Sequence, residues 1–222
     1  FNDGSYISDY FSGILLLNNN QYKESYKFLK RLNGLEENHL NYSSKYLYSL
    51  VNLGKFDEAF NYAKKLEKRK LDNFESDLIV GIYHLKNKQI DKAQQYFSKL
   101  KKRNSSFVLN KFLSNSLLNW SSFNKLNLNE AQKKIDMIDP QFKNLKDIEN
   151  LFLHCFYKSK KTEFYFKKLT AGNKVDFSRY NYFHATYLLN SDKINQAKKV
   201  IDSSLKLYPR NLLVNQYKFD LN

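Results

Sequence analysis

A short pattern of apolar and polar residues recurs along the chain. Each copy has an aromatic or aliphatic residue, two polar residues and a small one, followed by apolar residues at the spacing that predicts an amphipathic helix. The five copies are Tyr22-Lys23-Glu24-Ser25, Phe56-Asp57-Glu58-Ala59, Ile90-Asp91-Lys92-Ala93, Leu128-Asn129-Glu130-Ala131 and Ile194-Asn195-Gln196-Ala197.

The copies follow one another at a nearly constant interval. Their small residues stand at positions 25, 59, 93, 131 and 197, so successive positions differ by 34, 34, 38 and 66. The last interval, 66, fits two units of 33 residues. Phe164 then occupies the place that a small residue has in the other units. A period of this length predicts a repeat protein in which each unit is one supersecondary element.

A second helix is expected ahead of each copy, because apolar residues also have helical spacing there. These first helices are predicted near residues 6–18, 40–51, 74–86, 112–123, 145–157 and 179–189, with turns at 18–20, 54–55, 87–88, 124–125, 159–160 and 191–192. Four extra residues are expected between Lys101 and Lys111. The predicted units are therefore 6–39, 40–73, 74–111, 112–144, 145–177 and 178–211, followed by a terminal helix at 212–221.

A helix-turn-helix unit of about 34 residues, with small residues at its eighth and twentieth slots, resembles the tetratricopeptide repeat family. Pro209, after the second helix of the sixth unit, also fits the family pattern. The slot where the family favours Trp instead holds Asp9, Ser43, Asp77, Asn115, Ile148 and Asn181. The resemblance implies an all-α fold: a right-handed α-solenoid of about six repeats with a C-terminal capping helix, forming one superhelical domain (1–222) that is a fragment of a longer chain.

The small residues are expected where the two helices of a hairpin cross, because a large side chain there would hold the backbones apart. The predicted packing residues are Gly13, Ser25, Ala59, Gly81, Ala93, Ala131, Ala185 and Ala197.

Composition agrees with a helical protein and leaves the compartment open. Of 222 residues only 6 are Gly and 2 are Pro, so turn formers are scarce. The longest purely apolar run, Ile14 to Leu17, is far too short to span a membrane. The chain has one Cys and begins at Phe1, so both a periplasmic and a cytoplasmic location remain open.

The sequence carries no pattern typical of an enzyme, a cofactor site or a metal site. The glycines stand alone and form no phosphate-binding loop, and the four histidines form no HExxH pair. His154 and Cys155 are adjacent, but neighbours on a helix diverge by about 100° and form no catalytic dyad. We therefore predict a protein that is not an enzyme and binds no cofactor.

The resemblance implies that the first helices line a concave groove that binds a protein or peptide. The family's carboxylate clamp is not expected here, because Tyr10, Ile14, Lys45, Glu75 and Ile79 occupy its slots. The groove residues are instead mostly apolar and suggest a peptide or helix with hydrophobic anchors. They are Tyr48, Val51, Ile82, Leu85, Trp120, Phe123, Leu153 and Phe156.

Two questions stay open at this point. The apolar stripe could be buried as core by winding of the helices, or it could be covered by a peptide or by another part of the same chain. The net charge of +15 suggests an alternative function, contact with nucleic acid or an anionic membrane surface. However, residues 1–110 carry 18 − 12 = +6 and residues 111–222 carry 19 − 10 = +9, so neither half concentrates the charge and nucleic acid is the less favoured partner.

Overall fold

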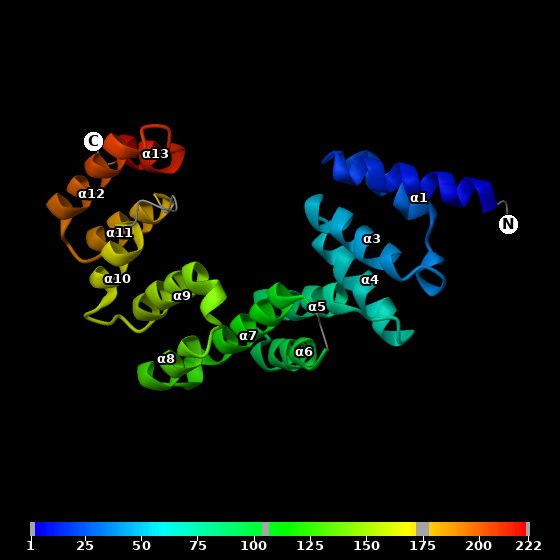
Figure 1. The fold of residues 1–222 in the computed structure, drawn as a ribbon, viewed down its shortest axis with the longest axis horizontal. Coiled ribbons are helices and arrows are strands. Elements are labelled where there is room, and N and C mark those ends of the chain that lie inside the picture. Colours follow the sequence, from blue (N-terminus) through cyan, green and yellow to red (C-terminus); the bar gives the residue numbers. More distant parts are fainter. Residues whose placement is uncertain (1–2, 104–106, 172–177, 221–222) are drawn as a thin grey trace. The chain divides into compact units, whose positions relative to one another are not determined.

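The computed structural model describes residues 3–103, 107–171 and 178–220, and all regular structure in these ranges is helical. Thirteen α-helices and three short 3-10 helices follow one another without a strand among the described residues, which confirms the all-α prediction. The chain divides into two compact units, Phe1–Asn124 and Lys125–Asn222, shown in Figure 1 from blue to green and from green to red. The prediction of one superhelical domain stays a prediction.

Unit 1 consists of consecutive helical hairpins. Each helix packs on its neighbours in sequence, and α3 also contacts α5. Leu29, Leu47, Leu50 and Leu66 are buried in the core shared by its first hairpins. The helices are α1 (Asp3–Asn18), α2 (Tyr22–Arg31), η1 (Leu35–Glu37), α3 (Leu40–Asn52), α4 (Phe56–Lys68), α5 (Phe74–Lys86), α6 (Ile90–Lys102) and α7 (Val108–Ser122), with η2 (Phe123–Lys125) at the boundary.

Unit 2 repeats this arrangement and ends on a single helix. Its helices are α8 (Leu128–Asp136), η3 (Pro140–Phe142), α9 (Lys143–Phe156), α10 (Thr162–Thr170), α11 (Arg179–Leu189), α12 (Ile194–Leu207) and α13 (Leu212–Asp220). α13 packs on both α11 and α12, and Val214 is fully buried there. The predicted pairs α1–α2, α3–α4, α5–α6, α9–α10 and α11–α12 pack as hairpins, and the predicted terminal helix is present. Leu221, the expected last helical residue, lies outside the described residues.

The turns inside the hairpins keep the repeat interval. Asn20, Gly54, Lys88, Lys158 and Asp192 all have positive φ, between 50° and 70°. Their successive positions differ by 34, 34, 70 and 34, so one left-handed residue separates the two helices of each of these hairpins. A left-handed residue allows a helix to end sharply. Between α7 and α8 the chain instead forms the 3-10 helix η2.

The small residues lie where helices approach closely. A Cβ placed on Gly81 would sit 2.6 Å from Cε1 of Phe97, and one placed on Gly13 would sit 2.8 Å from Cδ2 of Leu29. Ser25 is fully buried and donates a hydrogen bond of 2.7 Å from its Oγ to the carbonyl oxygen of Gly13. Ala59, Ala93, Ala131, Ala185 and Ala197 are all fully buried.

The fifth hairpin departs from the expected packing. Phe164, expected in the small slot of α10, is 60% exposed. Thr162 is fully buried instead, and its Oγ1 donates to the carbonyl oxygen of His154 at 2.8 Å. Because a Phe side chain is too large for a close helix crossing, the contact falls two residues earlier, where a small polar side chain fits.

The extra residues expected between Lys101 and Lys111 lengthen the first helix of the fourth unit. α7 begins at Val108, four residues before the predicted start at Phe112. Four residues are close to one helical turn of about 3.6 residues, so the insertion leaves the inward face of the helix almost unchanged.

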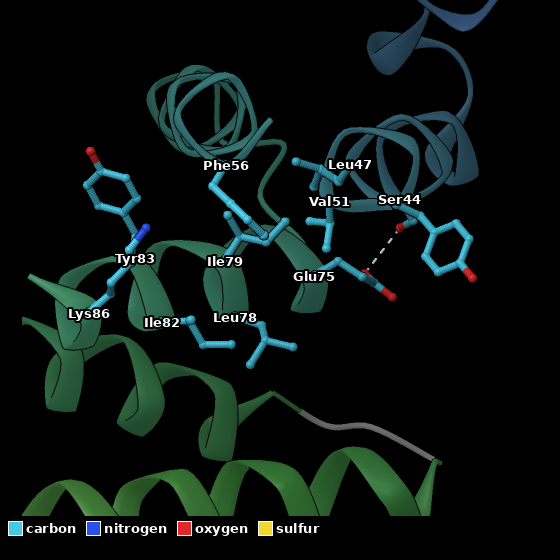
Figure 2. A pocket seen from close by; sticks show the side chains of 11 residues that line it. Ser44, Leu47, Val51, Phe56, Glu75, Leu78, Ile79, Ile82, Tyr83 and Lys86 are labelled. Carbon is cyan, nitrogen blue, oxygen red and sulfur yellow. Dashed lines mark hydrogen bonds between the residues drawn. The ribbon is translucent and has the colours of Figure 1, made fainter. Parts of the chain in front are cut away.

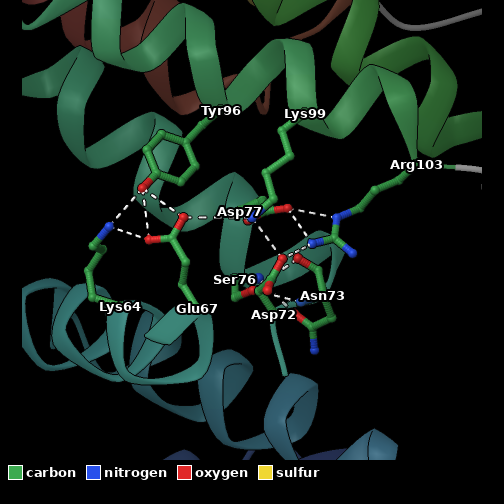
Figure 3. A network of polar contacts seen from close by, with 9 residues as sticks. All are labelled: Lys64, Glu67, Asp72, Asn73, Ser76, Asp77, Tyr96, Lys99 and Arg103. Carbon is green, nitrogen blue, oxygen red and sulfur yellow. Dashed lines mark hydrogen bonds and ion pairs between the residues drawn. The ribbon is translucent and has the colours of Figure 1, made fainter. Parts of the chain in front are cut away.

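A polar network joins the second and third hairpins at the slot where the family favours Trp (Figure 3). Asp77 of α5 is 1% exposed and is held by Arg103 at 2.6 Å and by Lys99 at 2.9 Å. Both cations also pair with Asp72. Asn73 caps α5 by accepting from the backbone of Ser76 at 2.9 Å. A buried carboxylate is tolerated here because it has two charged partners.

Candidate functional site

Unit 1 contains an apolar cavity of about 580 Å³ where α3, the start of α4 and α5 meet (Figure 2). The side chains around it are mainly aliphatic and aromatic, as is typical of small-ligand and peptide pockets. It is lined by Ser44, Leu47, Tyr48, Val51, Phe56, Glu75, Leu78, Ile79, Ile82, Tyr83 and Lys86.

Three of the lining residues are large apolar side chains that are about half exposed to solvent. Tyr48 is 51% exposed, Phe56 is 50% exposed and Ile82 is 45% exposed. Isolated exposed apolar residues are common on proteins, but these three line a single cavity. Their arrangement provides an apolar surface that a hydrophobic side chain of a partner can cover.

The polar groups lie at the ends of the cavity. At one end Ser44 Oγ donates to Glu75 Oε2 at 3.1 Å. At the other end the hydroxyl of Tyr83 donates to Asp57 Oδ1 at 3.1 Å, and Lys86 Nζ lies 5.7 Å from the centre of the Phe56 ring. Figure 2 shows Glu75 and Lys86 on opposite sides of the apolar residues.

A second, more polar cavity of about 430 Å³ adjoins the first. It shares Ser44, Tyr48 and Glu75 with the apolar cavity and adds residues of α1, α3 and the α1–α2 turn: Leu17, Asn18, Asn20 and Lys45. The Tyr48 ring is supported from this side by Tyr22, whose ring centre is 6.1 Å away in an edge-to-face arrangement. Together the two cavities form a continuous candidate site in unit 1.

The structure brings together three of the predicted groove residues. Tyr48, Val51 and Ile82 line the apolar cavity. Leu85 is half-buried and packs against the core formed by Ala93, Phe97 and Leu100. We therefore keep only Tyr48, Val51 and Ile82 in the candidate site.

The other predicted groove residues lie elsewhere. Phe123 is 1% exposed, and Trp120 packs edge-to-face on it with ring centres 4.7 Å apart. Leu153 of unit 2 is fully buried, whereas Phe156 is exposed. Phe123 and Leu153 are thus part of the cores and cannot line an open groove.

Sequence reasoning missed several lining residues, among them Phe56, Leu78, Ile79 and Lys86. The last three lie on α5 on the same face as Ile82, at helical intervals of three and four residues. Extending the face from Ile82 at this spacing was a usable signal. Phe56 begins the second helix of its hairpin, and nothing in the sequence pattern indicates that it faces the first helices.

The surroundings of the histidine and cysteine of α9 are set by packing. Burial raises the pKa of the Cys155 thiol to about 11, so almost no thiolate exists near neutral pH. Burial, with a smaller contribution from Lys161, lowers the pKa of His154, and the ring stacks on Tyr165 with centres 4.2 Å apart. Both residues are explained by packing.

Metal-site clusters and membrane-spanning helices are absent from the described residues. Within residues 3–103, 107–171 and 178–220, no group of three or more His, Cys, Asp or Glu side chains has the arrangement of a metal site. In the same ranges, every helix is too short or too polar to cross a bilayer.

The fold is found in proteins of known structure although the sequence is not close to any of them. No protein-family model matches the sequence, and curated proteins gave no match. PilF of Pseudomonas aeruginosa superposes with a TM-score of 0.60 at 12% identity, over 98% of both chains. The apo quorum sensor NprR from B. thuringiensis has a TM-score of 0.66 at 12% identity, covering 97% of this chain and 68% of NprR.

A third likeness is to the Cut9–Hcn1 hetero-tetramer of the APC/C. Its TM-score is 0.62 at 13% identity, with 95% of this chain but only 42% of that chain covered. PilF and Cut9 are tetratricopeptide-repeat proteins. At identities this low the likeness concerns the fold alone, so this chain has a helical-repeat fold similar to that of tetratricopeptide-repeat proteins.

Proposed function

We propose that the protein is a non-catalytic interaction scaffold whose unit 1 binds a peptide or a short helix in the cavity between α3 and α5. The observation that carries this proposal is the open apolar cavity of about 580 Å³ lined by Tyr48, Phe56 and Ile82. Covering such a surface removes apolar area from water, which is the main favourable contribution to association.

The fold supports this class of function. A second structure of NprR shows it in complex with its cognate peptide NprX. This complex superposes on 97% of the present chain with a TM-score of 0.57 at 13% identity. Stacked hairpins of this kind present extended surfaces built from successive first helices. In the present chain α3 and α5 are two such helices, and both contribute to the cavity.

The experiment selects peptides from a displayed library of short random sequences on the intact protein and measures their affinity by biolayer interferometry. Substituting Ile82→Arg places a charge among the apolar lining residues, where a bound anchor would have to desolvate it. We expect this substitution to weaken binding at least about tenfold, because disrupting a central anchor residue commonly costs about 2 kcal/mol or more and about 1.4 kcal/mol is a factor of ten.

The matched control is Leu15→Arg. Leu15 is also exposed and lies on a first helix, but it lines neither cavity. Peptides should bind this variant as tightly as the original protein. Failure to select any peptide, or equal affinity for the Ile82→Arg variant, would refute the proposed function.

A further inference from the structure

The face of α5 that lines the apolar cavity has an acid at its first position and a base at its last. Its six lining residues are spaced by three, one, three, one and three positions, which places them on one side of the helix. They are Glu75, Leu78, Ile79, Ile82, Tyr83 and Lys86. The four central residues are uncharged, so the face is charged only at its two ends.

Both charged side chains are exposed and held at the cavity. Glu75 accepts a hydrogen bond of 3.1 Å from Ser44, and the Lys86 ammonium group lies over the Phe56 ring. In the parts of unit 1 that the structure describes, neither side chain has an ion-pair partner within 4 Å. Lys45, the other nearby cation, lines only the adjoining polar cavity. Each charge is therefore available to a bound molecule.

The distance between the charges sets the size of the ligand. Lys86 follows Glu75 by eleven positions, and a helix rises about 1.5 Å per residue, so their backbones are about 16 Å apart. Three turns of a bound helix, or about five residues of an extended peptide, cover this length.

We infer that the cavity binds a short peptide in which apolar anchors separate a basic group, directed at Glu75, from an acidic group, directed at Lys86. This inference rests on the proposed function and adds the order of charges to it. Complementary charges at the rim of an apolar interface mainly set orientation and selectivity. A peptide with the opposite order would place like charges together at both ends.

The test uses two peptides. One is the peptide most enriched on the original protein. The other is a synthetic counterpart in which Glu replaces every Lys or Arg and Lys replaces every Asp or Glu. Affinities of both peptides are measured for the original protein and for the Glu75→Lys/Lys86→Glu variant. The original protein should prefer the enriched peptide by about tenfold, and the variant should prefer the counterpart. Raising the salt concentration should reduce both preferences, because exposed charges are screened.

The control variant is Glu24→Lys/Lys92→Glu, which has the same change in charge on exposed residues of α2 and α6 outside both cavities. It should behave like the original protein. If the enriched peptides show no fixed charge order, or if the Glu75→Lys/Lys86→Glu variant keeps the original preference, the inference is refuted. The proposed function still holds if peptides bind the original protein and Ile82→Arg weakens that binding. If no peptide binds the original protein, the proposed function itself is refuted.

Discussion

Replacing Gly81 with Ala tests whether the small residues are required by close helix packing. In an open helix this substitution stabilises by about 1 kcal/mol, because Ala has the higher helix propensity. Here the added methyl group would lie 2.6 Å and 2.9 Å from the Cε1 and Cδ1 atoms of Phe97, and 3.2 Å from Cβ of Tyr96. The Phe97 ring is fully buried and cannot swing into solvent.

The overlap should outweigh the gain in propensity. Overpacking a well-packed core typically costs about 1–3 kcal/mol, so we expect Gly81→Ala to lower the free energy of unfolding by about 1 kcal/mol in total. Gly13→Ala should also be destabilising, because Cδ2 and Cγ of the fully buried Leu29 would lie 2.8 Å and 2.9 Å from the added methyl group. Gly4→Ala should raise the free energy of unfolding by up to about 1 kcal/mol, because Gly4 lies in α1 and no atom lies within 4 Å of the added methyl group.

Urea unfolding followed by far-UV circular dichroism, fitted with a repeat-protein model, measures these differences. A second substitution, Phe97→Leu, removes Cε1, the atom that would overlap most with the added methyl group. In a double-mutant cycle it should make Gly81→Ala less costly, by about 1 kcal/mol of coupling. A Gly81→Ala variant that unfolds at higher urea than the original protein would refute the packing argument.

Two further predictions concern unit 2 and the turns. Burial lowers the pKa of His184 to about 4, whereas the pKa in the unfolded chain is near 6.5. The unfolded chain therefore binds a proton at a higher pH than the folded protein does. The free energy of unfolding is largest above pH 6.5 and falls as the pH is lowered from there towards 4. The free energy of unfolding of the original protein should therefore fall from pH 7 to pH 4 by up to about 3 kcal/mol more than that of a His184→Phe variant, and equal pH profiles would contradict this. Lys88 has a φ of 59°, a left-handed backbone conformation that is strained for any residue with a Cβ atom. Lys88→Gly should therefore raise the free energy of unfolding by about 0.5–1 kcal/mol in the same urea assay. A lower urea midpoint would contradict the assignment of strain to this turn.

The sequence predicted the helices well because their signals are local. The small residues at fixed intervals and the Asn, Gly and Ser residues of the turns mark each hairpin independently of its neighbours. For example, α3 and α5 begin at Leu40 and Phe74, the predicted first residues. The main difference in helix length, the early start of α7, lies within the segment where extra residues were expected.

The direction of individual side chains was harder to predict because it depends on how each helix is rotated about its axis. In α9, Phe152 occupies a slot that is small in other units, and its ring packs towards Tyr180 and Phe183 of α11. The helix buries Glu149 and Leu153, which occupy slots that regular spacing assigns to the groove. A strict repeat pattern cannot represent such a rotation.

The candidate site was predicted only in part for the same reason. Tyr48, Val51 and Ile82 follow from slot positions in two regular units, and all three line the cavity. Phe56 contributes from the start of α4, across the hairpin turn. The buried Asp77 stands where the family favours Trp, and its cationic partners come from α6 of the same hairpin, so only the fold reveals why a charge is accepted there.

The most direct test of the central claim is methyl NMR of the protein titrated with a selected peptide. If the peptide occupies the cavity of unit 1, the methyl signals of Val51, Ile79 and Ile82 should shift as the peptide is added. The methyl signals of Leu169 and Ile201, in the cores of unit 2, should stay in place. Unchanged signals around the cavity, or shifts concentrated in unit 2, would contradict the account.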